Sequence, residues 1–266
     1  HGPMETLVVG AGAMGRWLGE VLTGEYPESV DLSFLDTDQE RARSAAATVG
    51  GRAVDQESPG RFDLVCVAVP IPAATDAIAT YGDAAEHAIL DVTGTMTEPL
   101  DAMAEYAPDC ERASLHPLFA PENEPGNVPV AVGAGGRTLD GVLAALRERG
   151  NEVIETTAER HDEAMETVQA RTHAAVLAFG LAAAPVPDGF ETPISAGLAE
   201  LAEQVTDGEG RVYADIQSAF DGADDVAEAA RRIADADRET FQELYEEVAR
   251  GVNETEAGEG RSDDHG

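Results

Sequence analysis

Short apolar runs alternate with amphipathic segments over the first part of the chain. Segments such as AMGRWLGEVL (13–22) and LDGVLAALRERG (139–150) space apolar residues three and four positions apart, as on one face of a helix. The apolar runs between such segments have the length of single strands: ETLVVG (5–10), VDLSFLD (30–36), FDLVCVAVP (62–70), HAILDV (87–92), RASLHP (112–117), VPVAVG (128–133) and NEVIET (151–156). Strands that alternate with helices predict a parallel sheet built from βαβ units.

The pattern changes after Glu159. Residues 161–184 read as one long helix, and helical periodicity continues to about Val252 without a convincing strand. The end of the chain, NETEAGEGRSDDHG, is polar and contains glycine, so we expect it to be disordered. We therefore predict an α/β domain over residues 4–157, an all-helical domain over 158–252 and a disordered acidic tail over 253–266.

The charge balance indicates the salt concentration in which the protein works more than it indicates a function. The chain has 52 acidic residues against 17 basic ones, all of them arginine, and a formal net charge of −35. Such a charge destabilises a compact chain at low ionic strength, whereas molar salt shortens the Debye length to roughly 3 Å and screens the repulsion. We therefore expect a halophilic source. The absence of lysine excludes Schiff-base chemistry and a P-loop lysine.

Several classes of partner are not expected. The chain has no basic patch that would meet the phosphates of a nucleic acid. It has no run of 18 apolar residues and its opening does not read as a signal peptide, so we expect no membrane partner and a cytoplasmic protein. Cys66 and Cys110 are too few for a disulfide framework or a metal cluster, and we expect no metal.

A glycine-rich loop directly follows the first predicted strand. Gly10, Gly12 and Gly15 form the pattern G-x-G-x-x-G at the start of a helix, with Ala13 and Met14 inside the loop. The first glycine permits the tight turn, the second lets a pyrophosphate approach the backbone, and the third lets helix and strand pack closely. The alternative is a glycine turn in an α/β domain that binds no nucleotide. We favour a Rossmann-like dinucleotide-binding domain followed by an all-helical domain.

Two further positions bear on the cofactor. Asp36 ends the second strand, 21 residues after Gly15, where a carboxylate can accept a hydrogen bond from the ribose 2′-hydroxyl. The same carboxylate repels a 2′-phosphate, so NAD is expected rather than NADP. Val69 and Pro70 end the next long apolar run at the carboxyl edge of the sheet, where a dinucleotide would lie, although Pro70 could equally just end a strand.

His116 lies in the stretch SLHPLFAP, between the end of a strand and Pro117. A histidine in this position can be a core residue that caps a backbone carbonyl, or it can accept a proton in an active site. The residues of this stretch alone leave both interpretations open.

The long helix carries polar residues among apolar ones. Asp162, Met165, Gln169 and His173 follow one another at spacings of three, four and four, so they are expected on one helical face. A polar group on such a face is costly unless it is paired or serves a site. For His173, a core residue and a functional residue are both open interpretations.

Three segments in this order, behind the glycine loop, resemble the prephenate/arogenate dehydrogenase family of tyrosine biosynthesis. The resemblance covers most of residues 5–220. Its segments are LDVTGTMTEPLDAM (90–103), SLHPLFAPE (114–122), ERHDEAMETVQARTHAAVLAFGL (159–181), PI (193–194) and YADI (213–216).

Membership of this family implies oxidative decarboxylation of a cyclohexadienol to a phenol with NAD as hydride acceptor. The family's base maps onto His116, and its substrate-contacting positions map onto Gln169 and His173. An acidic position at the mouth of the site maps onto Glu122, which could equally be a solvated loop carboxylate. We expect the surrounding negative charge to raise the pKa of His116, a shift that molar salt would relax. By analogy we expect a homodimer through the helical domain.

The chain departs from the family pattern at two places. A serine, and a lysine two residues later, are replaced here by Gly94 and Met96, so Thr93 or Thr95 would have to supply the hydroxyl group. An arginine that binds a substrate carboxylate in many members is replaced by Gln204. Arg171 is two residues from His173 and is expected to face away from the site. The remaining candidates for the cation are Arg160, Arg211 and an arginine from a partner subunit.

Two classes of function follow. The first is an NAD-dependent dehydrogenase that converts prephenate to 4-hydroxyphenylpyruvate, or that acts on arogenate or a related small molecule. The second is an NAD-binding regulatory protein that kept the fold and lost catalysis, as the replaced arginine would allow. A β-hydroxyacid dehydrogenase is a weaker enzymatic alternative, because such enzymes commonly use a catalytic lysine and this chain has none.

Overall fold

The computed structural model describes residues 2–57 and 60–259, with side chains as far as residue 251, and it groups them into two compact units. The first unit comprises residues 1–169 and 206–220, and the second comprises 170–205 and 221–266. The predicted boundary after residue 157 follows chain order. The compact units instead assign residues 158–169 and 206–220 to the unit that contains the sheet.

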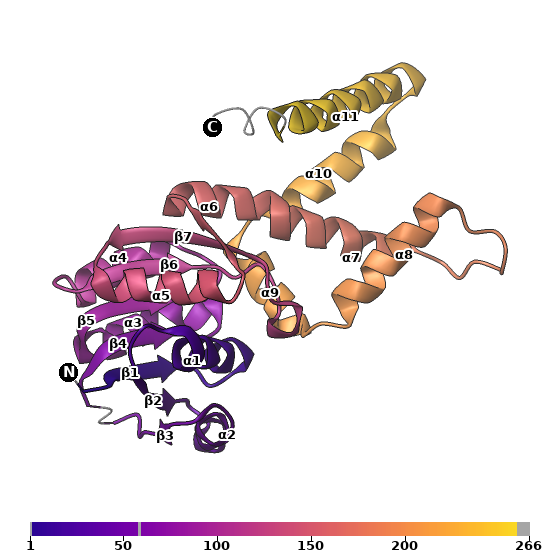
Figure 1. The fold of residues 1–266 in the computed structure, drawn as a ribbon. Helices are drawn as coiled ribbons and strands as arrows, with labels where there is room; N and C mark the ends of the chain where they lie inside the picture. Colours follow the sequence, from indigo (N-terminus) through magenta and orange to yellow (C-terminus); the bar gives the residue numbers. More distant parts are fainter. Residues whose placement is uncertain (1, 58–59, 260–266) are drawn as a thin grey trace. The chain divides into compact units, whose positions relative to one another are not determined.

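The first unit is built on one eight-stranded sheet with the order β3-β2-β1-β4-β5-β6-β7-β8 (Figure 1). The part from β3 to β6 has the order 3-2-1-4-5-6 that is typical of dinucleotide-binding α/β folds. The strands are β1 (Met4–Val9), β2 (Val30–Leu35), β3 (Arg52–Ala53), β4 (Phe62–Val67), β5 (Ala85–Asp91), β6 (Glu111–Leu115), β7 (Asn127–Ala134) and β8 (Glu152–Glu155).

The predicted parallel sheet is confirmed for all neighbouring strands except one pair. Strand β7 runs antiparallel to β6, while β8 runs parallel to β7. Residues 116–126 between β6 and β7 contain no crossover helix, so the chain reverses and returns beside β6. The two-residue strand β3 was also not predicted, because it is too short to show a hydrophobic pattern.

The helices of the first unit cover both faces of the sheet (Figure 1). Buried residues of α1, α2 and α5 pack with one face in a single apolar cluster, and buried residues of α3 and α4 pack with the other face in a second cluster. The strands alternate between the two clusters; Val8 belongs to the first and Leu7 and Val9 to the second. These helices are α1 (Ala13–Glu25), α2 (Gln39–Val49), α3 (Ala74–Tyr81), α4 (Thr97–Tyr106) and α5 (Arg137–Glu148).

The long helix predicted over residues 161–184 is not one continuous α-helix. It consists of α6 (Ala158–Met165), a π-helical segment (Glu166–Arg171) and α7 (Thr172–Ala182). A π-helix has more residues per turn than an α-helix, so the predicted single face through Asp162, Gln169 and His173 is wrong beyond Met165. Such segments often occur at functional sites.

The remaining helices are α8 (Pro193–Thr206), α9 (Gly210–Ala219), α10 (Gly222–Asp235) and α11 (Arg238–Glu259). Helix α9 belongs to the first unit, and α10 packs against α7 within the second. Helix α11 extends into the tail for which we expected no order, and residues 260–266 of that tail lie outside the described residues. Among the described residues, no helix is both long and apolar enough to cross a membrane.

Candidate active site

The predicted cofactor and catalytic segments meet at one edge of the sheet. Strands β1, β4, β5 and β6 are mutually parallel, so the segments that follow them lie at the same edge. These segments are the glycine loop, residues 68–70, the loop 92–96 and His116. The carboxyl edge of a parallel sheet is the usual position of ligands in this class of fold.

The glycine loop has the geometry of a dinucleotide cradle. Gly10 has a φ of +99°, and a Cβ there would lie 2.2 Å from the carbonyl oxygen of Ala68. A Cβ at Gly15 would lie 1.9 Å from the carbonyl oxygen of Gly10, so both positions require glycine. A Cβ at Gly12 would meet nothing within 4 Å. Gly12 therefore leaves open space directly before the first turn of α1, which contains no acidic side chain that would compete with a phosphate.

Asp36 is buried and its carboxylate is held by the glycine loop and by its own turn. One oxygen accepts from the N–H of Ala11 at 2.8 Å, and the other accepts from the N–H of Asp38 at 2.9 Å. The side chain of Arg41 approaches to 3.8 Å and is half exposed. The predicted ribose-binding carboxylate therefore lies beside the loop, as a dinucleotide site requires.

Val69 and Pro70 lie between β4 and the short 3₁₀ helix Ile71–Ala73. Val69 is partly buried and its Cγ1 lies 3.2 Å from the position of a Cβ at Gly10, whereas Pro70 is exposed. Pro70 also begins the 3₁₀ turn, since its carbonyl accepts from the N–H of Ala73 at 2.9 Å. The segment thus borders the glycine loop, but the predicted strand ends at Val67, three residues before Pro70.

His116 is buried directly after β6, and its backbone N–H donates to the carbonyl of Pro129 at 3.0 Å. Its imidazole does not cap a backbone carbonyl, because both ring nitrogens face other side chains. Nδ1 lies 2.9 Å from Nε2 of His161, and Nε2 lies 3.4 Å from the amide nitrogen of Gln169. The Nε2 side also borders Gly94, where a Cβ would lie 3.5 Å from this nitrogen.

His161 continues the chain of contacts to a carboxylate. Its side chain is 1% exposed, and its Nδ1 lies 2.8 Å from Oδ1 of Asp162. The rings of His116 and His161 meet edge to face, with centroids 5.1 Å apart. Asp162 also accepts from the backbone N–H groups of Met96 at 2.9 Å and Thr97 at 3.0 Å, at the beginning of α4. The carboxylate therefore caps a helix and holds an imidazole at the same time.

His161 was not assigned a role from the sequence, which placed Asp162 on the face toward the site. The structure turns Asp162 toward the N-terminus of α4 and turns His161 toward His116. The adjacent pair His161-Asp162 was visible in the sequence. Its function depends on α4, which lies about 60 residues earlier in the chain, so helical periodicity could not reveal it.

The expected rise in the pKa of His116 is wrong in sign. Burial, and next the nearby imidazole of His161, lower this pKa to about 3, although Asp162 acts in the opposite direction. The negative charge of the protein lies mainly on the surface, where solvent screens it. His116 is buried, and the missing solvation disfavours its charged form and lowers its pKa. His116 is therefore neutral near pH 7.

The loop after β5 lies beside the imidazole of His116. The hydroxyl of Thr93 donates to Asp91 at 2.6 Å, and Thr95 is buried and accepts through its carbonyl from the hydroxyl of Ser114 at 3.3 Å. Asp91 is fully buried, and the pKa of this carboxyl is raised to about 6 by burial, against the hydrogen bonds from Thr93. The predicted substrate hydroxyls are thus near the site, and that of Thr93 is already bonded to Asp91.

Two other predicted substrate residues, Glu122 and His173, belong to different compact units. Glu122 is exposed in the 3₁₀ helix Pro121–Asn123 of the first unit. His173 is half-buried in the first turn of α7, within the second unit, and burial lowers its pKa. Gln169, also on the predicted helical face, lies next to His116, with its amide nitrogen 3.4 Å from Nε2.

The candidate cations differ in their surroundings. Arg171 forms an ion pair with Asp225 at 2.6 Å within the second unit. Gln204 also belongs to that unit, whereas Arg160 and Arg211 belong to the first. Arg211 begins α9, which packs against the 3₁₀ helix Ile71–Ala73, and Ile71 in turn borders Gly94. Arg211 is 61% exposed and lies 3.8 Å from Glu209.

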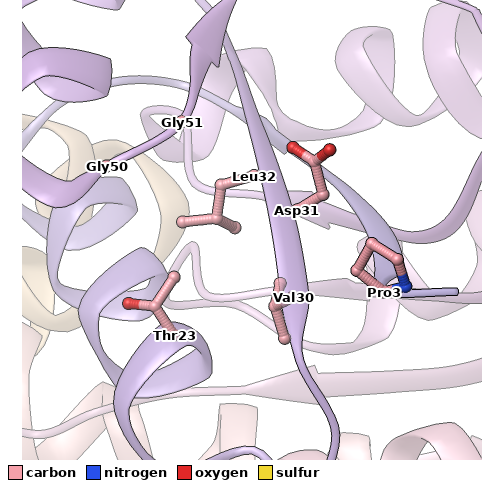
Figure 2. A pocket seen from close by; sticks show the side chains of 7 residues that line it. All are labelled: Pro3, Thr23, Val30, Asp31, Leu32, Gly50 and Gly51. Carbon is pink, nitrogen blue, oxygen red and sulfur yellow. The ribbon is translucent and has the colours of Figure 1, made fainter.

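Away from this edge of the sheet, two other kinds of candidate site come into question, a metal site and a surface hollow. Within the described part of the chain, no group of histidine, cysteine and acidic side chains is arranged so that it could hold a metal ion. Figure 2 shows a hollow lined by Thr23, Val30, Leu32 and the Gly50-Gly51 turn, among others. It lies where β2 begins, at the opposite edge of the sheet from His116, and its one carboxylate, Asp31, is paired with Arg52 at 3.1 Å.

Solved structures share this fold at low sequence identity. Prephenate dehydrogenase from Aquifex aeolicus, in complex with hydroxyphenyl propionate and NAD⁺, has a TM-score of 0.72 at 16% identity and covers 99% of both chains. Arogenate dehydrogenase from Synechocystis has a TM-score of 0.61 at 14% identity and covers 96% of this chain and 99% of its own. No protein-family model matches the chain.

A curated protein is similar in sequence over nearly the whole length. It is 4-amino-4-deoxyprephenate dehydrogenase from Streptomyces pristinaespiralis, 33% identical over 276 residues, which cover 92% of this chain and 90% of the relative. The match therefore spans the dinucleotide fold, His116 and the helical region together. The chain belongs to the prephenate dehydrogenase family of oxidoreductases.

Proposed function

We propose that the protein catalyses the NAD-dependent oxidative decarboxylation of prephenate to 4-hydroxyphenylpyruvate, with His116 as the base. The observation that carries the proposal is a neutral, buried imidazole whose Nε2 borders Gly94 and Gln169 at the carboxyl edge of a dinucleotide fold. A regulatory protein without catalysis would have no need to keep a desolvated histidine at this edge, at a cost to its stability below pH 6.5.

The proposed chemistry assigns His116 two proton transfers. NAD, when bound, accepts a hydride from the ring carbon that carries the hydroxyl. His116 Nε2 takes the hydroxyl proton as the C–O bond becomes a carbonyl. The C–C bond to the ring carboxylate then breaks, carbon dioxide leaves, and its electron pair makes the ring aromatic. His116 returns the proton to the ring oxygen, so the protein ends the cycle unchanged.

Residues 4–157 are proposed to bind the dinucleotide. The open space at Gly12 and the first turn of α1 at Ala13, Met14 and Gly15 fit a pyrophosphate. Asp36 supports NAD over NADP, because a 2′-phosphate would meet a buried carboxylate. Replacing Asp36 with Asn is expected to narrow the preference for NAD, measured as the ratio of the two dissociation constants. An unchanged ratio would contradict the role of Asp36.

Arg211 is proposed as the group that binds a substrate carboxylate in place of the family arginine at Gln204. Among the candidates of the first unit it lies on the helix that packs beside Ile71, and its link to Glu209 is loose. Arg211→Gln is expected to raise KM by about 10-fold or more with a smaller change in kcat, since a charge-assisted hydrogen bond is worth roughly 1.5–3 kcal/mol. Arg238→Gln, on an exposed helix of the second unit, is the matched control.

The sequence relative favours a second candidate substrate, one with an amino group at ring position 4. Buried Oε1 of Gln169 has no hydrogen-bond partner within the described part of the chain. A hydroxyl can donate one proton, to His116, whereas an amine can donate to both His116 and Gln169. The site chemistry therefore accommodates either substituent.

The deciding experiment follows NADH absorbance with prephenate, arogenate and 4-amino-4-deoxyprephenate in molar salt. We expect turnover with prephenate that falls by about 10²-fold or more in His116→Asn, the usual contribution of a general base. His87→Asn changes an exposed histidine on β5 and serves as the control. Turnover with the amino substrate alone would select the second candidate. Nucleotide binding without turnover on any of the three would favour the regulatory alternative, and full activity of His116→Asn would remove the base assignment.

A homodimer through the helical domain is proposed on the composition of α7. This helix is apolar around most of its circumference, yet Val176 is its one buried residue and Leu181 is 89% exposed. Such a helix normally lies inside a core or an interface. Leu181→Glu is expected to shift the mass measured by light scattering from dimer to monomer. A wild-type protein that is monomeric in molar salt would contradict the proposal.

A further inference from the structure

We infer that His161 and Asp162 are positioning residues that hold His116 in the tautomer with the proton on Nδ1, which places the lone pair of His116 on Nε2, the nitrogen proposed to accept the substrate proton. The inference rests on the proposed role of His116 as the base. It concerns the direction of every hydrogen bond between three side chains, and each direction follows from the one before it.

The direction is set at the Asp162 end. Two backbone N–H groups at the start of α4, those of Met96 and Thr97, both donate to this carboxylate. Although burial opposes ionisation, the hydrogen bonds from His161 and Thr97 hold the pKa of Asp162 below its usual range. An ionised carboxylate can only accept hydrogen bonds. The contact of 2.8 Å with Nδ1 of His161 therefore requires a proton on that nitrogen.

The same logic passes through His161. In the neutral form of His161, which carries one proton, a protonated Nδ1 leaves a lone pair on Nε2. This Nε2 lies 2.9 Å from Nδ1 of His116, inside the protein, where two facing lone pairs would be costly. Nδ1 of His116 must then donate, and the lone pair of His116 resides on Nε2.

Nε2 of His116 borders Gly94, whose lack of a side chain leaves this nitrogen accessible. The amide nitrogen of Gln169, which can only donate, lies 3.4 Å from Nε2, so this contact also requires the lone pair of His116 on Nε2. The opposite tautomer would present an N–H group here and could not accept a proton. The pair also serves the charged form, because an imidazolium at His116 would be linked through His161 to the negative charge of Asp162.

Substitutions at His161 test this without disturbing the cap of α4, since Asp162 is retained. His161→Leu removes the acceptor for Nδ1 of His116, and kcat is expected to fall between about 10²- and 10⁴-fold, the range found for general bases and their misoriented tautomers. His161→Gln restores an acceptor, because the carboxylate of Asp162 attracts the amide NH₂ and turns the amide oxygen toward His116. We expect His161→Gln to recover at least about 10-fold of that loss, with KM and nucleotide affinity within about 3-fold of wild type. Glu163→Gln, an exposed neighbour on the same helix, is the matched control.

A spectroscopic readout separates tautomer from packing. In the ¹⁵N spectrum of the full-length wild-type protein, both His116 and His161 should show a protonated Nδ1 and an unprotonated Nε2, with His116→Asn used for assignment. In His161→Leu the Nε2 signal of His116 should move toward the protonated position. A merely structural role of His161 would lower stability without moving this signal.

The outcomes distinguish the inference from the proposed function. A protonated Nε2 on His116 in the wild type, or equal turnover in His161→Leu and wild type, would overturn the inference while leaving the base assignment in place. If the wild type turns over none of the three substrates, the base assignment fails, and the ¹⁵N spectrum still shows whether the tautomer is fixed as inferred. If His161→Leu does not fold, the inference is tested by the wild-type ¹⁵N spectrum and by the turnover of His161→Gln.

Discussion

Lowering the pH should leave His116 neutral long after an ordinary histidine has become charged. Burial and the neighbouring imidazole of His161 lower its pKa from 6.5 to about 3. At about 1.4 kcal/mol per pKa unit, this shift corresponds to about 5 kcal/mol against the charged form. At pH 5 a histidine with the usual pKa is roughly 3% neutral, whereas His116 should be about 99% neutral.

The sign of the stability effect follows from the same shift. The unfolded chain takes up a proton on this histidine as the pH falls through 6.5, and the folded chain does not. The contribution of His116 to stability is therefore fully present above pH 6.5 and is lost progressively between pH 6.5 and pH 3. Between pH 7 and pH 5 the loss is about 2 kcal/mol, and a His116→Gln variant should be spared it.

Two measurements check this prediction. An NMR titration of the His116 imidazole should show no protonation between pH 7.5 and about pH 4.5. The kcat/KM profile, which reports groups of the free enzyme, should then lack an acid limb from a histidine near pH 6.5. Asp91, with a pKa raised to about 6, can give a separate limb, and Asp91→Asn identifies it. A His116 midpoint near 6.5 would refute the argument, because it would mean that the site is solvated.

Three further predictions concern other parts of the molecule. Gly94→Ser restores the family residue at a φ of +114°, where a side chain is strained, so it should lower the free energy of unfolding by about 1–3 kcal/mol. It should also lower kcat, because the new side chain crowds Nε2 of His116. A thermal melt and an activity assay that both match wild type would contradict this. The side chain of Glu124 is 8% exposed and accepts hydrogen bonds from Asn151 at 2.7 Å and from Arg149. Glu124→Gln should therefore lower the free energy of unfolding, measured in urea, by about 2–3 kcal/mol, and a decrease smaller than about 1 kcal/mol would contradict this. Raising NaCl from about 0.1 M to 2 M should raise Tm, because the charge of −35 is screened; a Tm that falls with salt would argue against the halophilic expectation.

Much of the first unit could be predicted because its residues act locally. Strands β1, β4 and β5 are buried on both faces over part of their length, so each contains a short apolar run that one can recognise without knowing its neighbours: residues 7–9, 64–67 and 88–90. Gly15 is likewise required by a backbone contact within a single βα unit, since a Cβ there would meet the carbonyl oxygen of Gly10. Signals of this kind lie within about 20 residues of sequence.

Features that depend on distant contacts were missed or given the wrong direction. The antiparallel pairing of β7 with β6 is a property of the chain between them, and the π-helical segment interrupts a periodicity that the sequence presents as continuous. The sign of the pKa shift of His116 was wrong because composition counts charges but does not show which of them are screened by solvent.

Residue patterns along the chain were enough to predict the alternation of strands and helices, the glycine loop with Asp36, and His116 as a candidate base in a family of dehydrogenases. Only the tertiary structure brought His161 onto His116 and Asp162 onto the first turn of α4. The physical reason is that a tautomer is fixed by the hydrogen-bond partner of each ring nitrogen, and those partners come from segments that meet only after the sheet has formed.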